Sequence, residues 1–223
     1  PGLDAGMDIA PTDARDDLVE DADAAEPDVP ADEGPSDVWS FDVTIPETLG
    51  GDRPATLVVP AGYRPDLSWP LVVVLHGYGA NAYVQDLLLG LSARVDSHRF
   101  VVLLPDGTVN EEQFQFWNAW PPCCNFYGSD VDDVAYLRGL IEEAQATLNI
   151  DPERVFLVGH SNGGFMSTRM ACEAADLVTG IVSIAGAMPP EADAGCTPAR
   201  PVSLLAIHGT KDTDIKYGGA SIG

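Results

Sequence analysis

The fold is decided by the stretch Val155-Phe-Leu-Val-Gly-His-Ser-Asn-Gly-Gly-Phe-Met166. It opens on four consecutive apolar residues, which is typical of a strand buried on both faces. Two glycines, Gly159 and Gly163, then stand two residues to either side of Ser161. The stretch predicts a buried strand, a sharp turn at Ser161, and a helix that begins directly after the turn.

The pattern around Ser161 is G-x-S-x-G, the nucleophile elbow. In such a turn the serine backbone is strained so that its hydroxyl projects from the sheet, and the two glycines remove side chains that would collide there. The N-terminus of the next helix directs free N–H groups at the position where negative charge develops. We expect Ser161 to be a catalytic nucleophile; the alternative is a purely structural glycine-rich turn.

Strands and helices alternate around this elbow. The later β-rich runs are continuously apolar, and helical stretches separate them from residue 71 onward. This alternation predicts an α/β fold whose mostly parallel sheet is flanked by helices. The expected strands are Trp39–Ile45, Ala55–Pro60, Leu71–Leu75, Phe100–Leu104, Val155–Val158, Ile181–Ile184 and Ser203–Ile207.

One helix can be placed between residues 131 and 149. Asp130, with Asp133 three residues later, is a start signal, and Asp151-Pro152 is a stop signal. The apolar face of this helix repeats at steps of three and four residues through Val134, Leu137, Ile141, Ala144 and Leu148.

A second loop supports the elbow. The strand Leu71–Leu75 ends in His76-Gly77-Tyr78-Gly79. In a fold with a nucleophile elbow, the loop after this strand supplies one oxyanion donor and the residue after the serine supplies the other. We assign these donors to the backbone N–H groups of Tyr78 and Asn162, and a structural role to His76.

A third element supplies an acid. Asp212 follows the late strand Ser203–Ile207 within His208-Gly-Thr-Lys-Asp212, which fits the chain order serine, acid, histidine. Its carboxylate would orient a catalytic histidine and stabilise the imidazolium. Asp214 is the competing candidate.

Together these motifs resemble the α/β-hydrolases of the poly(3-hydroxybutyrate) depolymerase-like and feruloyl esterase-like branch, related to carbohydrate esterase family 1. The resemblance covers about residues 39–223. The motifs that carry it are Leu75-His-Gly-Tyr-Gly79, Leu104-Pro-Asp-Gly107, the Trp117-Asn-Ala-Trp120 and Cys123-Cys124 loop, Asp130-Val-Asp-Asp-Val134, Gly159-His-Ser-Asn-Gly-Gly164 and His208-Gly-Thr-Lys-Asp212.

The resemblance implies a Ser–Asp–His triad, acyl or aryl ester substrates that are often polymeric, and neither a metal nor an organic cofactor. The aromatic loop with Trp117 and Trp120 either walls a substrate pocket or covers the core. Asp106, in Pro-Asp-Gly, is interpreted as a turn residue.

The resemblance also implies a catalytic histidine some tens of residues after the acid. Four histidines are present: His76, His98, His160 and His208. None is a plausible base, because the first and last match structural His-Gly pairs, His98 falls at the far edge of the sheet, and His160 is turned away. We therefore expect a C-terminally truncated hydrolase domain that is nearly inactive as it stands, since loss of a triad histidine costs about 10⁶ in kcat.

Charge divides the chain. The net charge is −24, and residues 1–37 carry thirteen acids and one base. This segment is expected to be a disordered acidic linker, and residues 38–223 the hydrolase domain. The body is acidic too, which argues against nucleic acid or an anionic membrane as a partner. The sequence begins with Pro1 and holds no apolar run long enough to cross a bilayer, so a signal peptide or lipid anchor would lie upstream of residue 1.

Four cysteines bear on the compartment. Their spacing matches no zinc pattern, and the even count is compatible with two disulfides in an oxidising compartment. Because a bridge between adjacent cysteines is strained, we expect Cys123 and Cys124 each to reach one of Cys172 and Cys196; four buried thiols are the alternative. The cysteines and the acidic segment favour a secreted or cell-envelope protein.

The sequence therefore predicts an exported serine esterase that acts through an acyl-enzyme. Two other functions are compatible with the same motifs. A serine peptidase would use the same triad, although peptidases of this fold usually carry an additional large domain. A surface lipoprotein would keep the fold for binding without catalysis.

Overall fold

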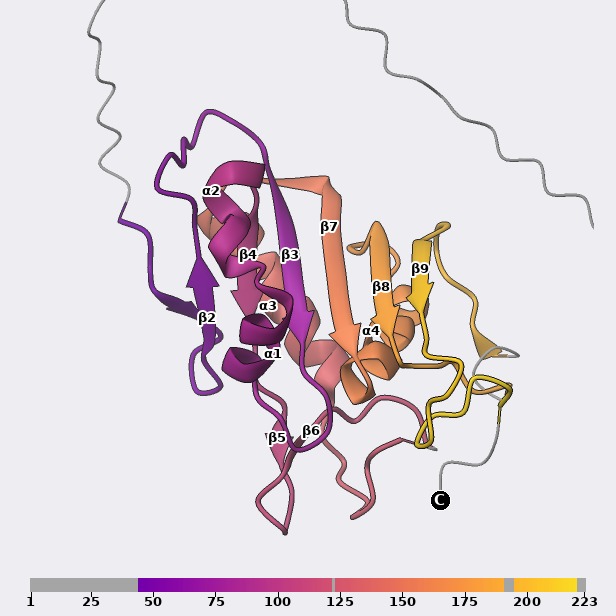
Figure 1. Cartoon of the computed structure of the whole chain (residues 1–223). Helices are drawn as coiled ribbons and strands as arrows, with labels where there is room; N and C mark the ends of the chain where they lie inside the picture. Colours follow the sequence, from indigo (N-terminus) through magenta and orange to yellow (C-terminus); the bar gives the residue numbers. More distant parts are fainter. Residues whose placement is uncertain (1–43, 122, 191–194, 220–223) are drawn as a thin grey trace, which may run out of the picture. The chain divides into compact units, whose positions relative to one another are not determined.

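The computed structural model describes residues 44–121, 123–190 and 195–219. Within them, seven strands form one sheet in the order β1-β2-β4-β3-β7-β8-β9 (Figure 1). The four pairs that join β4, β3, β7, β8 and β9 are all parallel, and β1 and β2 add antiparallel strands at one edge. The strands are β1 Thr48–Leu49, β2 Ala55–Val58, β3 Trp69–Leu75, β4 Val101–Leu104, β7 Ile150–His160, β8 Gly180–Ile184 and β9 Ser203–Ile207.

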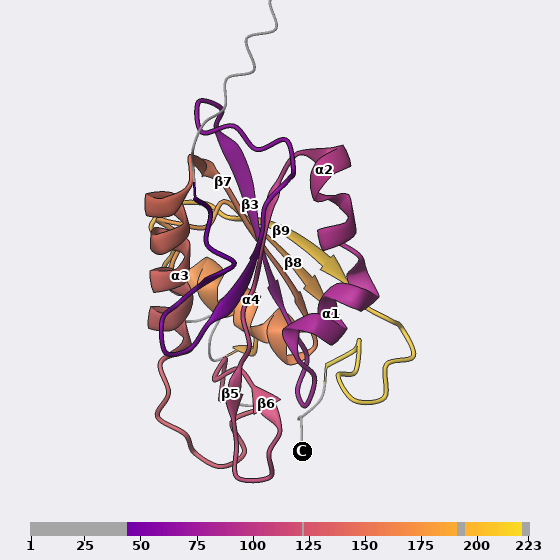
Figure 2. The same cartoon turned by 90° about the vertical axis from the view of Figure 1, so that its left-hand side faces the viewer.

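Helices cover both faces of the sheet, which confirms the predicted fold class. Helices α1 (Ala82–Leu89) and α2 (Val95–His98) lie on one face, and α3 (Asp133–Thr147) and α4 (Asn162–Glu173) lie on the other (Figure 2). A single 3-10 turn, Ser92–Arg94, precedes α2. A small hairpin of β5 (Thr108–Val109) and β6 (Gln115–Phe116), which the sequence did not predict, extends from the end of the sheet that carries the candidate site.

Strand β3 shows why its sequence is continuously apolar. Leu71, Val73 and Leu75 are fully buried in the main core cluster, which also contains residues of α3 and α4. Val74 belongs to the second cluster, which includes Val95 of α2. Successive side chains of a strand point to opposite faces, so a strand covered by helices on both sides must be apolar at every position.

Helix α3 matches the predicted apolar face, but both end signals were wrong. The residue that caps its N-terminus is Asp132, whose Oδ1 accepts the N–H of Ala135 at 2.9 Å, and not Asp130. The helix already ends at Thr147, and Asp151-Pro152 lies inside β7. Asp133 is fully buried, and its carboxylate pairs with Arg53, which offsets the cost of burying the charge.

Every expected strand from Ala55 onward is present, and the strand ends agree with the prediction to within two residues. The exception is the N-terminal end of β7, which extends back to Ile150. The expected strand at Trp39–Ile45 and the acidic segment 1–37 lie outside the described residues, except for residues 44 and 45, which form no strand. No helix in the described ranges is both long and apolar enough to cross a bilayer.

The predicted disulfide pairing was wrong. The structure pairs Cys123 with Cys124, and Cys172 with Cys196 at a Cα–Cα distance of 5.4 Å. Cys123 is not part of α4 but lies beside its first residue, since its sulfur is 3.8 Å from Asn162 Nδ2. Cys172 is in α4, ten residues after Asn162, which corresponds to a rise of about 15 Å along the helix. Since a disulfide spans Cα atoms less than about 7 Å apart, Cys123 and Cys172 cannot be joined.

We predict that alanine at Gly159 or Gly163 destabilises the fold by about 3 kcal/mol or more, because each new Cβ would overlap backbone atoms. At Gly159 it would meet the carbonyl of Gly163, and at Gly163 the carbonyl of Leu75. The matched control is Gly139→Ala in α3, where no atom stands within 4 Å of a new Cβ and where alanine favours the helix by about 1 kcal/mol. Urea unfolding measures all three; equal stability of the three variants would contradict the packing described.

Candidate active site

Ser161 lies on a strained turn between β7 and α4. Its backbone has φ 51° and ψ −118°, a left-handed φ that side-chain-bearing residues rarely adopt. Two hydrogen bonds hold the turn: the Ser161 N–H donates to the carbonyl of Ile184 at 2.8 Å, and the Ser161 carbonyl accepts the N–H of Phe165 at 3.0 Å. The sequence placed this serine correctly at a strand–turn–helix junction.

The loop after β3 lies against this turn. A Cβ on Gly77 would stand 3.4 Å from Ser161 Cβ, so the loop passes directly beside the serine. The next residue, Tyr78, and the residue after the serine, Asn162, have backbone N–H groups for which no acceptor is found among the described residues. Unpaired backbone donors are uncommon in folded proteins. Both assigned donors are therefore available to a ligand.

The side chain of Asn162 fixes a segment that is distant in sequence. Its Oδ1 accepts the N–H of Trp117 at 2.7 Å, and its Nδ2 donates to the Trp117 carbonyl at 3.0 Å. Both residues are fully buried. This paired contact joins the aromatic loop to the first residue of α4. The sequence pattern indicated a role only for the backbone of Asn162, not for its side chain.

His76 connects the same segment to the end of β4. Its Nε2 accepts the N–H of Gly107 at 2.8 Å, and its backbone carbonyl accepts Trp117 Nε1 at 3.0 Å. Burial lowers the pKa of His76, which keeps the imidazole neutral. With Nε2 acting as an acceptor, the ring proton is on Nδ1, which lies 2.8 Å from the Gly77 carbonyl. These contacts support the structural role assigned to His76.

Arg53 anchors the loop that follows β4, and no pattern in the sequence indicated this role. Its Nε and Nη2 donate to the carbonyl of Asp106 at 3.0 and 2.8 Å, and its Nη1 pairs with Asp133 Oδ1 at 2.7 Å. Asp106 Oδ1 in turn accepts the N–H of Ala82 at the start of α1. Asp106 is therefore more than the turn residue that was expected.

Asp212 lies in the loop after β9. Its Oδ1 accepts the N–H groups of Asp214 and Ile215, each at 2.9 Å, and its Oδ2 is 3.3 Å from His208 Nε2. The bond from the Ile215 N–H is the largest of the influences that lower the pKa of Asp212, so it is a carboxylate at neutral pH. Asp214, the competing candidate, is exposed. The structure thus gives the two acids different surroundings.

No histidine among the described residues is hydrogen-bonded to the Ser161 side chain. His98 ends α2, next to the start of β4, so it lies at the opposite end of the parallel strands from the serine. His208 Nε2 is 2.5 Å from the carbonyl of Ile215. His160 has Nδ1 close to Gly77 and is near enough to Asp212 to contribute to lowering its pKa.

The two candidate tryptophans differ. Trp117 is fully buried and packs on His76 with ring centroids 5.1 Å apart, so for this residue the core-covering alternative holds. Trp120 is half-buried, donates from Nε1 to Thr168 Oγ1 at 3.0 Å, and borders a hollow that Asn125 and Arg169 also line.

Comparison with known proteins identifies the family of this chain. Residues 64–221 match the family model described as phospholipase/carboxylesterase. The chain belongs to this family. Feruloyl esterase B of Piromyces equi is 30% identical over 75% of this chain and 30% of its own length. Poly(3-hydroxyalkanoate) depolymerase C of Paucimonas lemoignei is 32% identical over 52% of this chain and 28% of its own length.

A solved structure, that of a thermostable esterase, has the same fold. It superimposes with a TM-score of 0.57 at 19% identity, over 77% of this chain and 48% of that one. The family match and the curated relatives confirm the resemblance to esterase-like α/β-hydrolases. The chain spans less than half the length of the first curated relatives that it matches.

We predict that Asn162→Ala destabilises the protein by about 1–3 kcal/mol, because it leaves the buried Trp117 N–H without a partner and removes one of the two donors to the Trp117 carbonyl, the other being the Ala119 N–H. Asn149→Ala is the control, since Asn149 is exposed and its side chain makes one bond, to the Pro65 carbonyl; its loss should cost less than about 1 kcal/mol. Chemical denaturation measures both variants. Equal losses would show that the Asn162–Trp117 contact does not stabilise the fold.

Proposed function

We propose that this family member hydrolyses carboxylic esters with Ser161 as the nucleophile. The observation that carries the proposal is the strained Ser161 turn, beside which the N–H groups of Tyr78 and Asn162 have no acceptor in the part of the chain that the structure describes. That is the arrangement needed to form and stabilise a tetrahedral oxyanion.

The reaction follows from these groups. Ser161 Oγ attacks the ester carbonyl carbon while its proton passes to a histidine base, and the carbonyl oxygen becomes an oxyanion facing the Tyr78 and Asn162 N–H groups. Collapse of this intermediate breaks the C–O bond and releases the alcohol, which takes the proton from the histidine. Water then attacks the acyl-enzyme carbonyl in the same way, giving its proton to the histidine, and the acid is released as Ser161 takes that proton back. Asp212 holds the histidine in the required tautomer.

The base itself is proposed to be a histidine outside residues 1–223. Supporting this, none of the four histidines, His160 included, is hydrogen-bonded to the Ser161 side chain within the described residues. His76 uses Nε2 to accept a backbone N–H, His208 uses Nε2 at the Ile215 carbonyl, and His98 lies at the other end of the sheet. A serine hydroxyl without a base is a weak nucleophile. The 223-residue chain alone should accordingly be nearly inactive.

The proposed substrates are uncharged esters with an aryl or polymer-linked group. Aromatic side chains gather at the Tyr78 loop: Phe114 and Phe126 contact the Tyr78 ring at centroid distances of 5.8 and 5.3 Å, and both are exposed. Exposed aromatic faces favour flat, apolar groups. The names of the two curated relatives, a feruloyl esterase and a polyhydroxyalkanoate depolymerase, agree with this class.

We also propose that the protein is exported. Disulfides persist in oxidising compartments, and the Cys172–Cys196 pair joins α4 to the segment between β8 and β9. A lipid anchor upstream of residue 1 stays a prediction.

The nucleophile is tested by Ser161→Ala in the protein extended to include the proposed histidine. Hydrolysis of a short aryl ester should fall by about 10⁶ in kcat, while the melting temperature stays unchanged. The control is Ser97→Ala, because Ser97 lies in α2 at the far end of the sheet, and it should keep full activity. More than a few per cent of residual activity in Ser161→Ala would refute the assignment.

The acid is tested by comparing Asp212→Asn with Asp214→Asn in the same protein. An asparagine at 212 can still accept the N–H groups of Asp214 and Ile215, so the loop should persist. It cannot stabilise an imidazolium, and kcat should fall by about 10⁴. Asp214→Asn should remain within about twofold of the unaltered enzyme, since exposed charges contribute little. The reverse ranking would assign the role to Asp214.

A further inference from the structure

Two peptide units from different loops are linked through the buried ring of His76. One is the Asp106–Gly107 unit and the other is the Gly77–Tyr78 unit, and both are trans. His76 Nε2 accepts the Gly107 N–H at 2.8 Å, and His76 Nδ1 lies 2.8 Å from the Gly77 carbonyl. A neutral imidazole has one donor and one acceptor nitrogen. The Gly107 N–H therefore fixes the ring proton on Nδ1 and directs it at the Gly77 carbonyl.

The orientation of the Gly77–Tyr78 unit decides where the Tyr78 N–H points. In a trans peptide unit the C=O and N–H point in opposite directions, so a donor that holds the Gly77 carbonyl also fixes the Tyr78 N–H. The His76 ring supplies one such donor, and the Ala80 N–H supplies a second at 3.1 Å. A Cβ on Gly77 would stand 3.4 Å from Ser161 Cβ, so this unit lies beside the serine.

Arg53 fixes the other peptide unit. Its Nε and Nη2 both donate to the Asp106 carbonyl, at 3.0 and 2.8 Å, and its charge is balanced by the buried carboxylate of Asp133. Two donors on one carbonyl hold the Asp106–Gly107 unit in a single orientation, and this orientation directs the Gly107 N–H at the His76 ring. Arg53 thus determines which nitrogen of His76 carries the proton.

The hydrogen bonds of this chain all run in the same direction, from the Arg53 guanidinium to the Tyr78 N–H. Bonds aligned in this way polarise one another, so each one strengthens the next. We propose that Arg53 and His76 are positioning residues, which act through the two peptide units to hold the Tyr78 N–H where the oxyanion forms. The inference rests on the proposed ester hydrolysis and adds two residues, neither of which touches the substrate.

Two substitutions of His76 separate the two hydrogen bonds of its ring. In His76→Asn, the amide nitrogen takes the place of Nδ1 and can still donate to the Gly77 carbonyl, but nothing replaces Nε2. In His76→Gln, the amide oxygen takes the place of Nε2 and can still accept the Gly107 N–H, but the donor to Gly77 is lost. Both variants lose the packing of the ring on Trp117 and keep one hydrogen bond of two, so similar losses of thermal stability are expected.

Hydrolysis of a short aryl ester is measured for both variants of the protein extended to include the proposed catalytic histidine. His76→Gln should lower kcat by about ten- to a hundredfold; loss of a whole oxyanion donor costs about 10²–10³, and here the Ala80 bond to the Gly77 carbonyl remains. KM should stay nearly unchanged, because the oxyanion forms only in the transition state. His76→Asn should retain most of its kcat. Equal losses of kcat in the two variants would overturn the proposal.

Arg53 is tested by whether its effect passes through the His76 ring. Arg53→Lys keeps a positive charge beside Asp133, but an ammonium group lacks the planar pair of donors that holds the Asp106 carbonyl. With His76 in place, this substitution should lower kcat by about two- to tenfold. In the His76→Asn protein it should have no further effect on kcat, because the ring acceptor is gone. No loss with His76 in place, or equal losses in both proteins, would overturn the role of Arg53.

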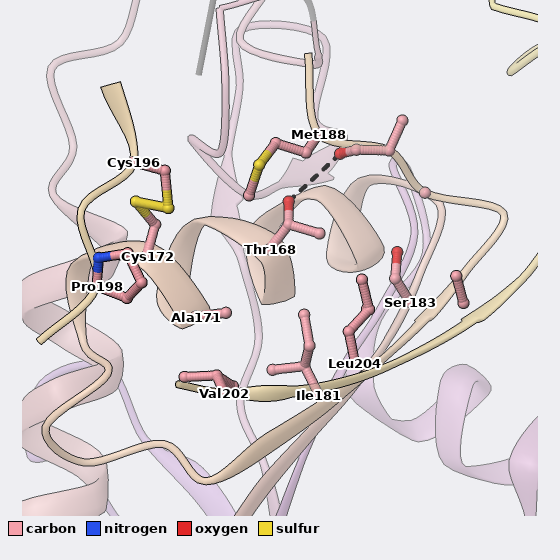
Figure 3. A pocket seen from close by; sticks show the side chains of 13 residues that line it. Thr168, Ala171, Cys172, Ile181, Ser183, Met188, Cys196, Pro198, Val202 and Leu204 are labelled. Atoms are coloured by element: carbon pink, nitrogen blue, oxygen red, sulfur yellow. Dashed lines mark hydrogen bonds between the residues drawn. A yellow bond between two sulfur atoms is a disulfide. The ribbon is translucent and has the colours of Figure 1, made fainter. Parts of the chain in front are cut away.

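Ile181→Val is the control for loss of stability alone. Ile181 is buried in β8, in the wall of the apolar hollow between α4 and the strands β8 and β9, away from the His76 ring (Figure 3). This variant should lower the melting temperature and leave kcat unchanged. If the unaltered protein showed no hydrolysis that depends on Ser161, the proposed function and this inference would fail together. Full activity that depends on Ser161, with His76→Asn and His76→Gln behaving alike, would overturn this inference only.

Discussion

The constraint on which this structure depends is the close backbone packing at the start of α4. Gly159 and Gly163 allow the strand β7, the helix and the end of β3 to approach without an intervening side chain. That approach holds the backbone of Ser161 at a φ of 51°. Strain at a single residue persists only where the surroundings over-determine it, and here the parallel sheet and the helix do so. The same packing sets the position of the Asn162 N–H, so the proposed nucleophile and the proposed oxyanion donor share one structural cause.

The loops around Ser161 are held by a chain of buried hydrogen bonds. Asn162 binds both backbone groups of Trp117, Trp117 Nε1 binds the His76 carbonyl, and the His76 ring accepts the N–H of Gly107. Gly107 follows Asp106, whose carbonyl is held by Arg53. Segments more than a hundred residues apart in sequence are joined in this way. Catalysis by fixed donors requires such rigidity, because the oxyanion must find its N–H groups already in place.

The features that the sequence predicts well are those governed by local pattern. Continuous apolar runs located β3, β7 and β8, the three- and four-residue apolar repeat located α3, and the glycine spacing located the Ser161 turn. The features it missed depend on distances between remote residues. No local signal marks Arg53 as the partner of Asp133, or the Asn162 side chain as the partner of Trp117. The disulfide pairing failed for the same reason, because the length of α4 separates Cys172 from Cys123.

The central claim is that Ser161 is the reacting nucleophile. It is tested most directly by treating the active, extended protein with a fluorophosphonate and locating the covalent adduct by peptide mass spectrometry. The account predicts a single phosphonylated peptide that contains Ser161, with loss of ester hydrolysis in proportion to the labelling. An adduct on any other serine, or full inactivation without modification of Ser161, would contradict it.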